Sequence, residues 1–248
     1  MWVGDGHLSE PDQDLELLSA YEKNRSVKFF SPEDRRRYVT AWAAVRRVLA
    51  GYLGTGPRGI LFGRGGSAPD SGNHSQLVVA SSLPRVRLSV ARSEDLWVLG
   101  LTVGDPIGVD LEHVRGFDTE GLVDRCLAPQ EQRQVRALSG EARDTAFIRA
   151  WTRKQAVMKA AGLPLTTPPH QVLVHPGEPS AVRAELLHDT RHALGNWTVQ
   201  DMPPVRSALT AVARPVGCAG AVDWYDCTNG NTLAPAGLLS KSNNHEEM

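Results

Sequence analysis

Apolar and polar positions recur with helical spacing through the first long segment of the chain. Between Tyr38 and Tyr52, large apolar side chains stand three and four positions apart, so they share one face of a helix. The ends of this segment are also marked, because Ser31 can cap a helix, Pro32 suits its first position and Gly54 suits its end. The pattern predicts a helix between Ser31 and Gly54 with one buried face.

Strand-like alternation follows this helix. Val86, Leu88 and Val90 alternate with polar residues, as in a half-buried strand. Residues 96–103 have the pattern of a second, more buried strand beside it. Further short strands are expected near residues 171–174, 181–187, 196–201 and 207–213. Strands and helices in this order predict a fold of the α/β (α+β) class.

Two more helices are expected in the middle of the chain. Pro129 begins a charged helix that runs to about residue 138, and Gly140 separates it from a longer helix that Gly162 stops. The longer helix carries Lys154 and Lys159. Its apolar stripe consists of Phe147, Trp151, Val157 and Met158.

Asp110 and Glu112 stand two residues apart at the end of an apolar, β-branched run. Strand alternation sends both carboxylates to the same face, which makes half of a site for a hard cation such as magnesium. Lys154 and Lys159 could then meet the negative charge that the metal holds. A solvated strand edge and a charged helix face are the alternative interpretations of these two motifs.

The two motifs together resemble those of the 4'-phosphopantetheinyl transferases of the surfactin-synthetase type. That family carries G-[VI]-D-x-E, and some forty residues later W-[ST]-x-K-E-[AS]-x-x-K; this chain has GVDLE at residues 108–112 and WTRKQAVMK at residues 151–159. The resemblance extends to residues 30–49, which are similar to the arginine-bearing first helix of the family. Leu88-Ser89 stands where the family has a Ser-His-Ser segment.

The resemblance implies two similar α/β halves, related by a pseudo-twofold axis, with a cleft between them for coenzyme A and metal. The expected organisation is an N-terminal extension over residues 1–24, a first half over 25–105, a second half over 106–225 and a flexible tail over 226–248. The turn residues Gly104-Asp105-Pro106 suit the boundary between the halves.

The implied reaction transfers the phosphopantetheine arm of coenzyme A to a serine of an acyl or peptidyl carrier protein, with Mg²⁺ as cofactor. Asp110 and Glu112 would hold the metal, and Lys154 and Gln155 occupy the catalytic positions of the second motif. The residues expected to contact coenzyme A are Lys154, Lys159, Ser89 and Arg46.

Three positions depart from the family pattern. Gln155 replaces a glutamate that is implied to bind metal and to help deprotonate the carrier serine; a neutral amide offers an oxygen to a cation but cannot take a proton. Ser89 is followed by Val90 instead of histidine, and Ala68 stands in place of a lysine. The alternative function is therefore a diverged homologue without transferase activity, which binds carrier proteins or catalyses another reaction on a biosynthetic intermediate.

Composition limits the classes of partner and the cellular compartment that we expect. The 248 residues carry a net charge of −1 with 22% charged residues, which gives no indication of nucleic-acid binding. No window has the apolar length of a membrane helix. The three cysteines lack metal or disulfide spacing, so we expect reduced thiols in a cytoplasmic protein. We also expect a monomer.

Overall fold

The structure is a computed structural model, and it describes residues 1–6, 11–64, 77–80, 85–115, 120–178, 181–187, 197–218 and 220–228. Ala68, which stands in place of a lysine of the family pattern, lies outside the described residues. The same holds for the expected tail beyond residue 228.

Runs of helices and runs of strands follow one another along the chain. The helices are α1 (Pro11–Leu17), α2 (Ala20–Ser26), α3 (Pro32–Leu53), α4 (Glu120–Cys126), α5 (Pro129–Arg136) and α6 (Gly140–Ala161), with 3-10 turns at Pro57–Gly59 and Pro169–Gln171. The strands of the first part are β1 (Trp2–Asp5), β2 (Phe62–Arg64), β3 (Leu77–Val79), β4 (Val86–Ser93) and β5 (Leu96–Val103). The later strands are β6 (Gly108–His113), β7 (Val172–Leu173), β8 (Val182–Leu186), β9 (Trp197–Asp201), β10 (Ala208–Pro215) and β11 (Tyr225–Asp226).

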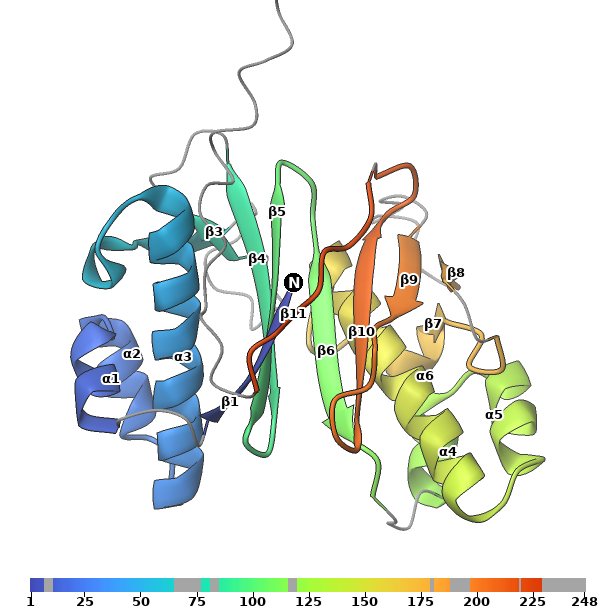
Figure 1. Ribbon diagram of the computed structural model, residues 1–248. Helices are drawn as coiled ribbons and strands as arrows, with labels where there is room; N and C mark the ends of the chain where they lie inside the picture. Colours follow the sequence, from blue (N-terminus) through green and yellow to red (C-terminus); the bar gives the residue numbers. More distant parts are fainter. Residues whose placement is uncertain are drawn as a thin grey trace, which may run out of the picture.

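The strands form two sheets that lie side by side between two layers of helices (Figure 1). The first sheet has the order β11-β1-β5-β4-β3-β2 and the second β6-β10-β9-β8-β7. Helix α3 covers the outer face of the first sheet and α6 the outer face of the second. The prediction of an α/β (α+β) fold is confirmed; the pseudo-twofold relation between two similar halves remains a prediction.

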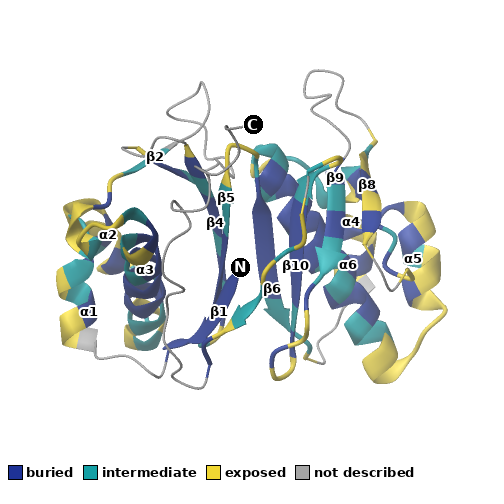
Figure 2. Ribbon diagram, turned by 45° about the horizontal axis from the view of Figure 1, so that its top comes forward, coloured by how far each residue is buried: buried dark blue, intermediate teal, exposed yellow. Residues whose placement is uncertain are grey.

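Apolar side chains fill the space between the two sheets, and Figure 2 shows the facing strands as mostly buried. The buried members of this core are Met1, Val3, Ala91, Leu96, Val98, Ile107, Val109, Leu111, Met202, Val205, Ala208 and Val212. Hydrogen bonds also join the sheets, since the backbone N–H of Val109 donates to Ser89 Oγ at 3.0 Å. No helix among the described residues is long and apolar enough to cross a membrane.

Helix α3 begins and ends as its sequence predicts. Ser31 Oγ accepts the backbone N–H of Asp34 at 3.3 Å, and Pro32 occupies the first turn. Gly54 has φ 62°, a left-handed conformation that glycine adopts without steric cost. One face of α3 packs against the first sheet. This face contains Val45, Tyr52 and other large apolar residues.

The segment predicted as an N-terminal extension contributes strand β1 to the first sheet. Strand β1 pairs with β5 in antiparallel register and with β11 in parallel register. Because β11 stands at the end of the segment predicted as the second half, that end joins the first sheet. An apolar run as short as that in β1 carries little periodicity, so the sequence pattern alone does not reveal this strand.

A glycine sets how closely β6 approaches α6. A Cβ atom added to Gly108 would lie 1.9 Å from the carbonyl oxygen of Ala156 and 2.5 Å from the nitrogen of Ala160. These distances are far below van der Waals contact, so only glycine fits between strand and helix. Close contact at this point brings the side chains that follow Gly108 on β6 next to α6.

Candidate functional site

Strand β6 turns one face to the core between the sheets and the other to α6. Val109 and Leu111 belong to the core between the sheets. Asp110 contacts Lys159 of α6, while Glu112 lies beside Trp151 of the same helix. Alternation along the strand thus places both carboxylates next to α6, as we expected from their spacing.

Asp110 is a buried carboxylate with one bonded and one unbonded oxygen. Lys159 Nζ donates to Asp110 Oδ1 at 2.7 Å and to the carbonyl oxygen of Val109 at 3.1 Å. Asp110 Oδ2 has no hydrogen-bond partner among the described residues. Burial raises the pKa of Asp110 from 3.8 to about 6, against the opposing effect of the Lys159 charge.

Gln155 lies on the same helical stripe as the residues that meet the carboxylates. Trp151, Gln155 and Lys159 follow one another at intervals of four, so they share one face of α6. All three are partly exposed, whereas most neighbouring positions of the helix are buried. The structure therefore brings Asp110, Glu112, Lys159 and the Gln155 stripe onto facing surfaces of β6 and α6.

Lys154 lies elsewhere, in the interior beneath α6. Its ammonium group forms an ion pair with Glu131 Oε2 at 2.5 Å and donates to the carbonyl oxygen of Val172; all of its side chain is buried. Glu131 also accepts backbone N–H groups from Ala128 and Val174, each at 2.9 Å. Burial lowers the pKa of Lys154, and the Glu131 charge opposes this effect. These contacts tie α6 to α5 and leave Lys154 no open side.

Arg46 and Ser89 are also engaged in structural contacts. The Arg46 guanidinium is 1% exposed, lies 2.8 Å from Glu22 Oε2 and donates to the carbonyl oxygen of Ile60 at 3.1 Å. Because α3 covers the outer face of the first sheet, Arg46 does not meet the carboxylate pair. Ser89 is buried and bonds the backbone of β6 at Val109.

A serine that the sequence patterns do not single out contacts Glu112 directly. Ser93, the last residue of β4, donates from Oγ to Glu112 Oε2 at 2.9 Å. It also accepts the backbone N–H of His113 at 3.4 Å. Ser93 shares a face of β4 with Ser89, so the alternation along this strand could have indicated that Ser93 faces the same way. The contact of Ser93 with Glu112 depends on how the two sheets pack.

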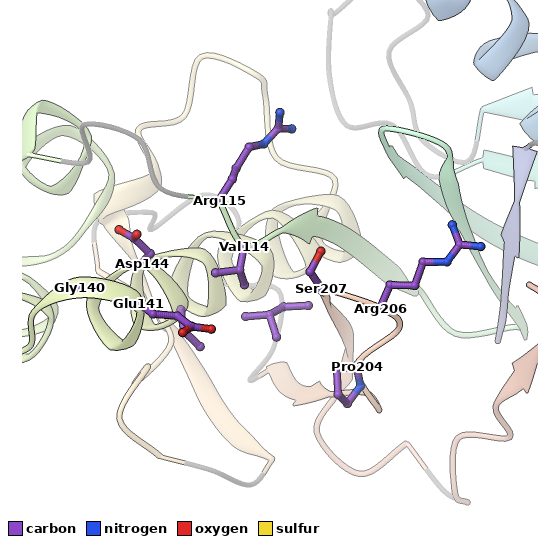
Figure 3. A pocket seen from close by; sticks show the side chains of 10 residues that line it. Val114, Arg115, Gly140, Glu141, Asp144, Pro204, Arg206 and Ser207 are labelled. Atoms are coloured by element: carbon purple, nitrogen blue, oxygen red, sulfur yellow. The ribbon is translucent and has the colours of Figure 1, made fainter.

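Two hollows adjoin the end of β6. One, of about 210 Å³, is lined by Glu112 and His113 together with apolar side chains that include Phe147, Ile148 and Trp151. The other, of about 440 Å³, lies between the start of α6 and the turn before β10 (Figure 3). Acidic Glu141 and Asp144 and basic Arg206 line the second hollow, and none of the predicted site residues does.

A third hollow, of about 400 Å³, joins cations with aromatic rings next to α2. Arg25, Lys28, Tyr21 and Phe29 line it. Behind Phe29, the Arg92 guanidinium lies 5.9 Å from the Phe29 ring centroid, and it lies 5.3 Å from the ring centroid of Tyr38. None of the three cations forms an ion pair with a described residue. Arg92 directly precedes Ser93, so this cationic hollow and the carboxylate pair lie near the same end of β4.

The donor set at β6 limits what it can hold. Among the described residues, no group of three or more histidine, cysteine, aspartate or glutamate side chains is placed to bind a metal ion. Asp110 and Glu112 supply two carboxylates, and the stripe of α6 adds the neutral amide of Gln155. Such a set suits a cation that keeps water or phosphate oxygens among its ligands.

Comparisons with known proteins identify similar sequences. The family described as the 4'-phosphopantetheinyl transferase superfamily matches residues 106–212, which include the carboxylate pair and α6. Over 214 residues the chain is 28% identical to 4'-phosphopantetheinyl transferase HetI of Nostoc sp., covering 83% of this chain and 84% of that protein. It is 31% identical over 158 residues to putative 4'-phosphopantetheinyl transferase slr0495 of Synechocystis sp., covering 63% and 62% respectively.

A further relative extends along most of both chains. The 4'-phosphopantetheinyl transferase ffp of Bacillus subtilis is 26% identical over 207 residues, which are 83% of this chain and 87% of that protein. The similarity therefore extends beyond the residues that the family model matches. These matches and the paired motifs of β6 and α6 support membership of the chain in the 4'-phosphopantetheinyl transferase superfamily.

Proposed function

We propose that the protein transfers the phosphopantetheine arm of coenzyme A to a serine hydroxyl of an acyl or peptidyl carrier protein. The observation that carries this proposal is the facing arrangement of Asp110 and Glu112 on β6 and Lys159 on α6, with Lys159 Nζ 2.7 Å from Asp110 Oδ1. Carboxylates for a metal and an adjacent cation for phosphate are what a transfer from a pyrophosphate requires.

Asp110 and Glu112 are the residues that would hold Mg²⁺. The buried Oδ2 atom of Asp110 has no hydrogen-bond partner among the described residues, and burial raises the pKa of this group. A divalent cation would supply the missing partner. Two carboxylates leave positions for water and phosphate oxygens, as Mg²⁺ prefers. When bound, the ion would neutralise the pyrophosphate and orient it for attack.

Lys159 and the cationic hollow are the proposed contacts for the phosphates of coenzyme A. Lys159 lies at the carboxylate pair, where the pyrophosphate would sit. Arg25, Lys28 and Arg92 surround aromatic side chains and lack acidic partners among the described residues, which suits a planar base that carries phosphate. Lys154 and Arg46 are buried in ion pairs, so the proposal gives them structural roles.

In the proposed reaction, the serine oxygen of the carrier bonds to the β-phosphorus of coenzyme A. The bond from that phosphorus to the bridging oxygen breaks, adenosine 3',5'-bisphosphate leaves and the hydroxyl proton is released. Gln155 cannot accept this proton. General-base help typically contributes about a hundred- to ten-thousand-fold to a rate, so we expect a transfer slower than that of a variant with glutamate at this position.

Intact-mass measurement of apo carrier proteins from the same organism tests the proposal. Each carrier is incubated with the protein, coenzyme A and Mg²⁺, and adenosine 3',5'-bisphosphate is measured in parallel. We expect the carrier to gain the phosphopantetheine mass, and Gln155→Glu to increase the rate. Asp110→Asn should abolish transfer, whereas Asp124→Asn, which removes an exposed carboxylate that pairs with Arg136, should leave it unchanged.

Gln155 also favours a second candidate, a carrier-binding relative that has lost transfer. In that case the wild-type protein adds no mass to any carrier, although it binds one in a pull-down or by calorimetry. Transfer gained only by Gln155→Glu would mark a transferase disabled at one residue. No transfer by either protein, with carrier binding retained, would replace the proposed function by the binding function.

A further inference from the structure

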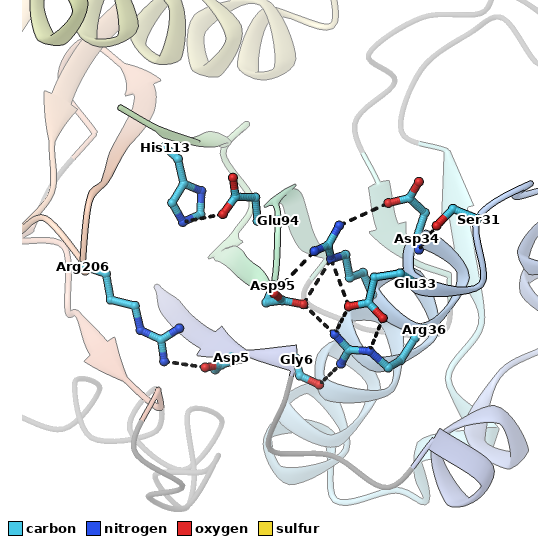
Figure 4. A network of polar contacts seen from close by, with 11 residues as sticks. Asp5, Gly6, Ser31, Glu33, Asp34, Arg36, Glu94, Asp95, His113 and Arg206 are labelled. Carbon is cyan, nitrogen blue, oxygen red and sulfur yellow. Dashed lines mark hydrogen bonds and ion pairs between the residues drawn. The ribbon is translucent and has the colours of Figure 1, made fainter. Parts of the chain in front are cut away.

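The two-residue turn between β4 and β5 is held from both halves of the molecule (Figure 4). Ser93 pairs with Leu96 across it, which leaves Glu94 and Asp95 at its tip. Arg36 and Arg37 of α3 contact Asp95 at 2.6 and 3.1 Å. The turn is therefore fixed to the first half through Asp95.

Glu94 fixes the other side of the turn. Its φ of 50° is a left-handed conformation that is strained for a glutamate, and such strain persists only where the surroundings hold it. Arg115 Nη1 lies 3.3 Å and His113 Nε2 lies 3.7 Å from the Glu94 carboxylate. Both partners belong to the segment at the end of β6, so the turn is attached to the residues that follow Glu112.

Ser93 stands between these two attachments with its hydroxyl group against Glu112. It donates to Glu112 Oε2 at 2.9 Å, accepts the His113 N–H at 3.4 Å and lies 3.2 Å from His113 Nδ1. Ser93 is 6% exposed, so water does not readily replace these contacts. Glu112 Oε1 has no hydrogen-bond partner among the described residues.

We propose that Ser93 is a positioning residue for the carboxylate pair. Its hydroxyl holds Glu112 Oε2 in one orientation and so presents the free Oε1 to a divalent cation shared with Asp110. The inference rests on the proposed function for the metal site. Hydrogen-bond partners of metal-binding carboxylates commonly change metal affinity about ten- to a hundredfold when they are removed.

Binding of Mn²⁺ alone to the purified protein, followed by the electron paramagnetic resonance signal of the free ion, tests this role. We expect Ser93→Ala to raise the Mn²⁺ dissociation constant about tenfold. In the transfer assay, the same variant should need about tenfold more Mg²⁺ for half-maximal rate and reach a near-normal rate at saturating Mg²⁺. Ser26→Ala, which removes another buried serine hydroxyl, should change neither value.

A second pair of variants covers the case in which Ser93→Ala does not fold. Ser93→Thr keeps the hydroxyl group. Ser93→Val has the shape of threonine without the hydroxyl, and both residues suit a strand. Threonine should restore Mn²⁺ affinity to within about threefold of wild type, with valine showing the tenfold loss. Equal affinity in the two variants overturns the inference.

The outcome for Asp110→Asn separates this inference from the proposed function. If Asp110→Asn loses Mn²⁺ binding while Ser93→Ala binds like wild type, the metal site stands and Ser93 has no positioning role. If Asp110→Asn binds Mn²⁺ normally, or the wild-type protein binds none, the proposed metal site fails and takes the inference with it.

Discussion

Lys159 Nζ lies 2.7 Å from Asp110 Oδ1, which ties the last turns of α6 to the middle of β6. The contact satisfies only one side of the carboxylate, because Oδ2 has no hydrogen-bond partner among the described residues. Burial raises the pKa of Asp110 to about 6 in spite of the adjacent ammonium. The site therefore holds its negative charge at a cost in stability, as expected where a further cation is to bind.

Replacing Asp110 by asparagine should stabilise the metal-free protein at neutral pH. The folded state raises the pKa from 3.8 to about 6, so the stability from this group is full below pH 4 and is lost as the pH rises toward 6. The pKa difference corresponds to at most about 3 kcal/mol in the free energy of unfolding. The gain is smaller than this because Lys159 loses its ionised partner in the variant. Thermal melting of wild type and Asp110→Asn from pH 4 to 8 measures it.

The melting temperature of Asp110→Asn should exceed that of the wild type by an amount that increases with pH and approaches zero near pH 4. Added Mg²⁺ should then raise the melting temperature of the wild type and leave that of Asp110→Asn unchanged. A variant that melts below the wild type at every pH would contradict the prediction, since it would show that the ionised carboxylate stabilises the fold.

Lys154→Met should destabilise the protein strongly, because it leaves Glu131 buried without its cation. Removal of one partner from a buried ion pair typically costs about 3–5 kcal/mol. The double variant with Glu131→Gln should lose less than the sum of the two single losses. Urea unfolding of the four proteins measures this coupling. If Lys154 instead binds phosphate, Lys154→Met will retain wild-type stability and lose coenzyme A binding.

Gly108→Ala should separate β6 from α6. The added Cβ would lie 1.9 Å from the carbonyl oxygen of Ala156, which is backbone and cannot swing aside. We expect a loss of about 1–3 kcal/mol or more, as for other overpacked sites. Gly121→Ala is the matched control, because nothing lies within 4 Å of its added Cβ and alanine favours the helix. Equal urea midpoints for both variants would contradict the predicted contact.

Arg25→Ala should weaken binding of adenosine 3',5'-bisphosphate, because Arg25 lines the cationic hollow that suits this end of coenzyme A. Hydrogen bonds to charged groups contribute about 1.5–3 kcal/mol, which corresponds to roughly ten- to a hundredfold in the dissociation constant. Arg87→Ala removes the same charge from a half-buried position on β4, where Arg87 donates to the Gly104 carbonyl, and should bind like wild type. Calorimetric titration compares the two; matching affinities would exclude the hollow as the nucleotide site.

The elements that the sequence determined are those whose patterns act within one segment. Ser31, Pro32 and Gly54 set the ends of α3, and Gly162 stops α6 in a left-handed conformation with φ 65°. Alternation along β6 placed Asp110 and Glu112 on one face before any contact was known. Caps and alternation depend on backbone geometry alone, which is the same wherever the segment is packed.

Only the tertiary structure decided which charged side chains face one another. Lys154 and Lys159 stand five residues apart on one helix, yet one is buried with Glu131 and the other contacts Asp110. Ser93 meets Glu112, and β11 joins β1, through the packing of distant segments. Such contacts depend on how the sheets and helices are placed, and a motif spacing that reports neighbours along the chain carries no information about that placement.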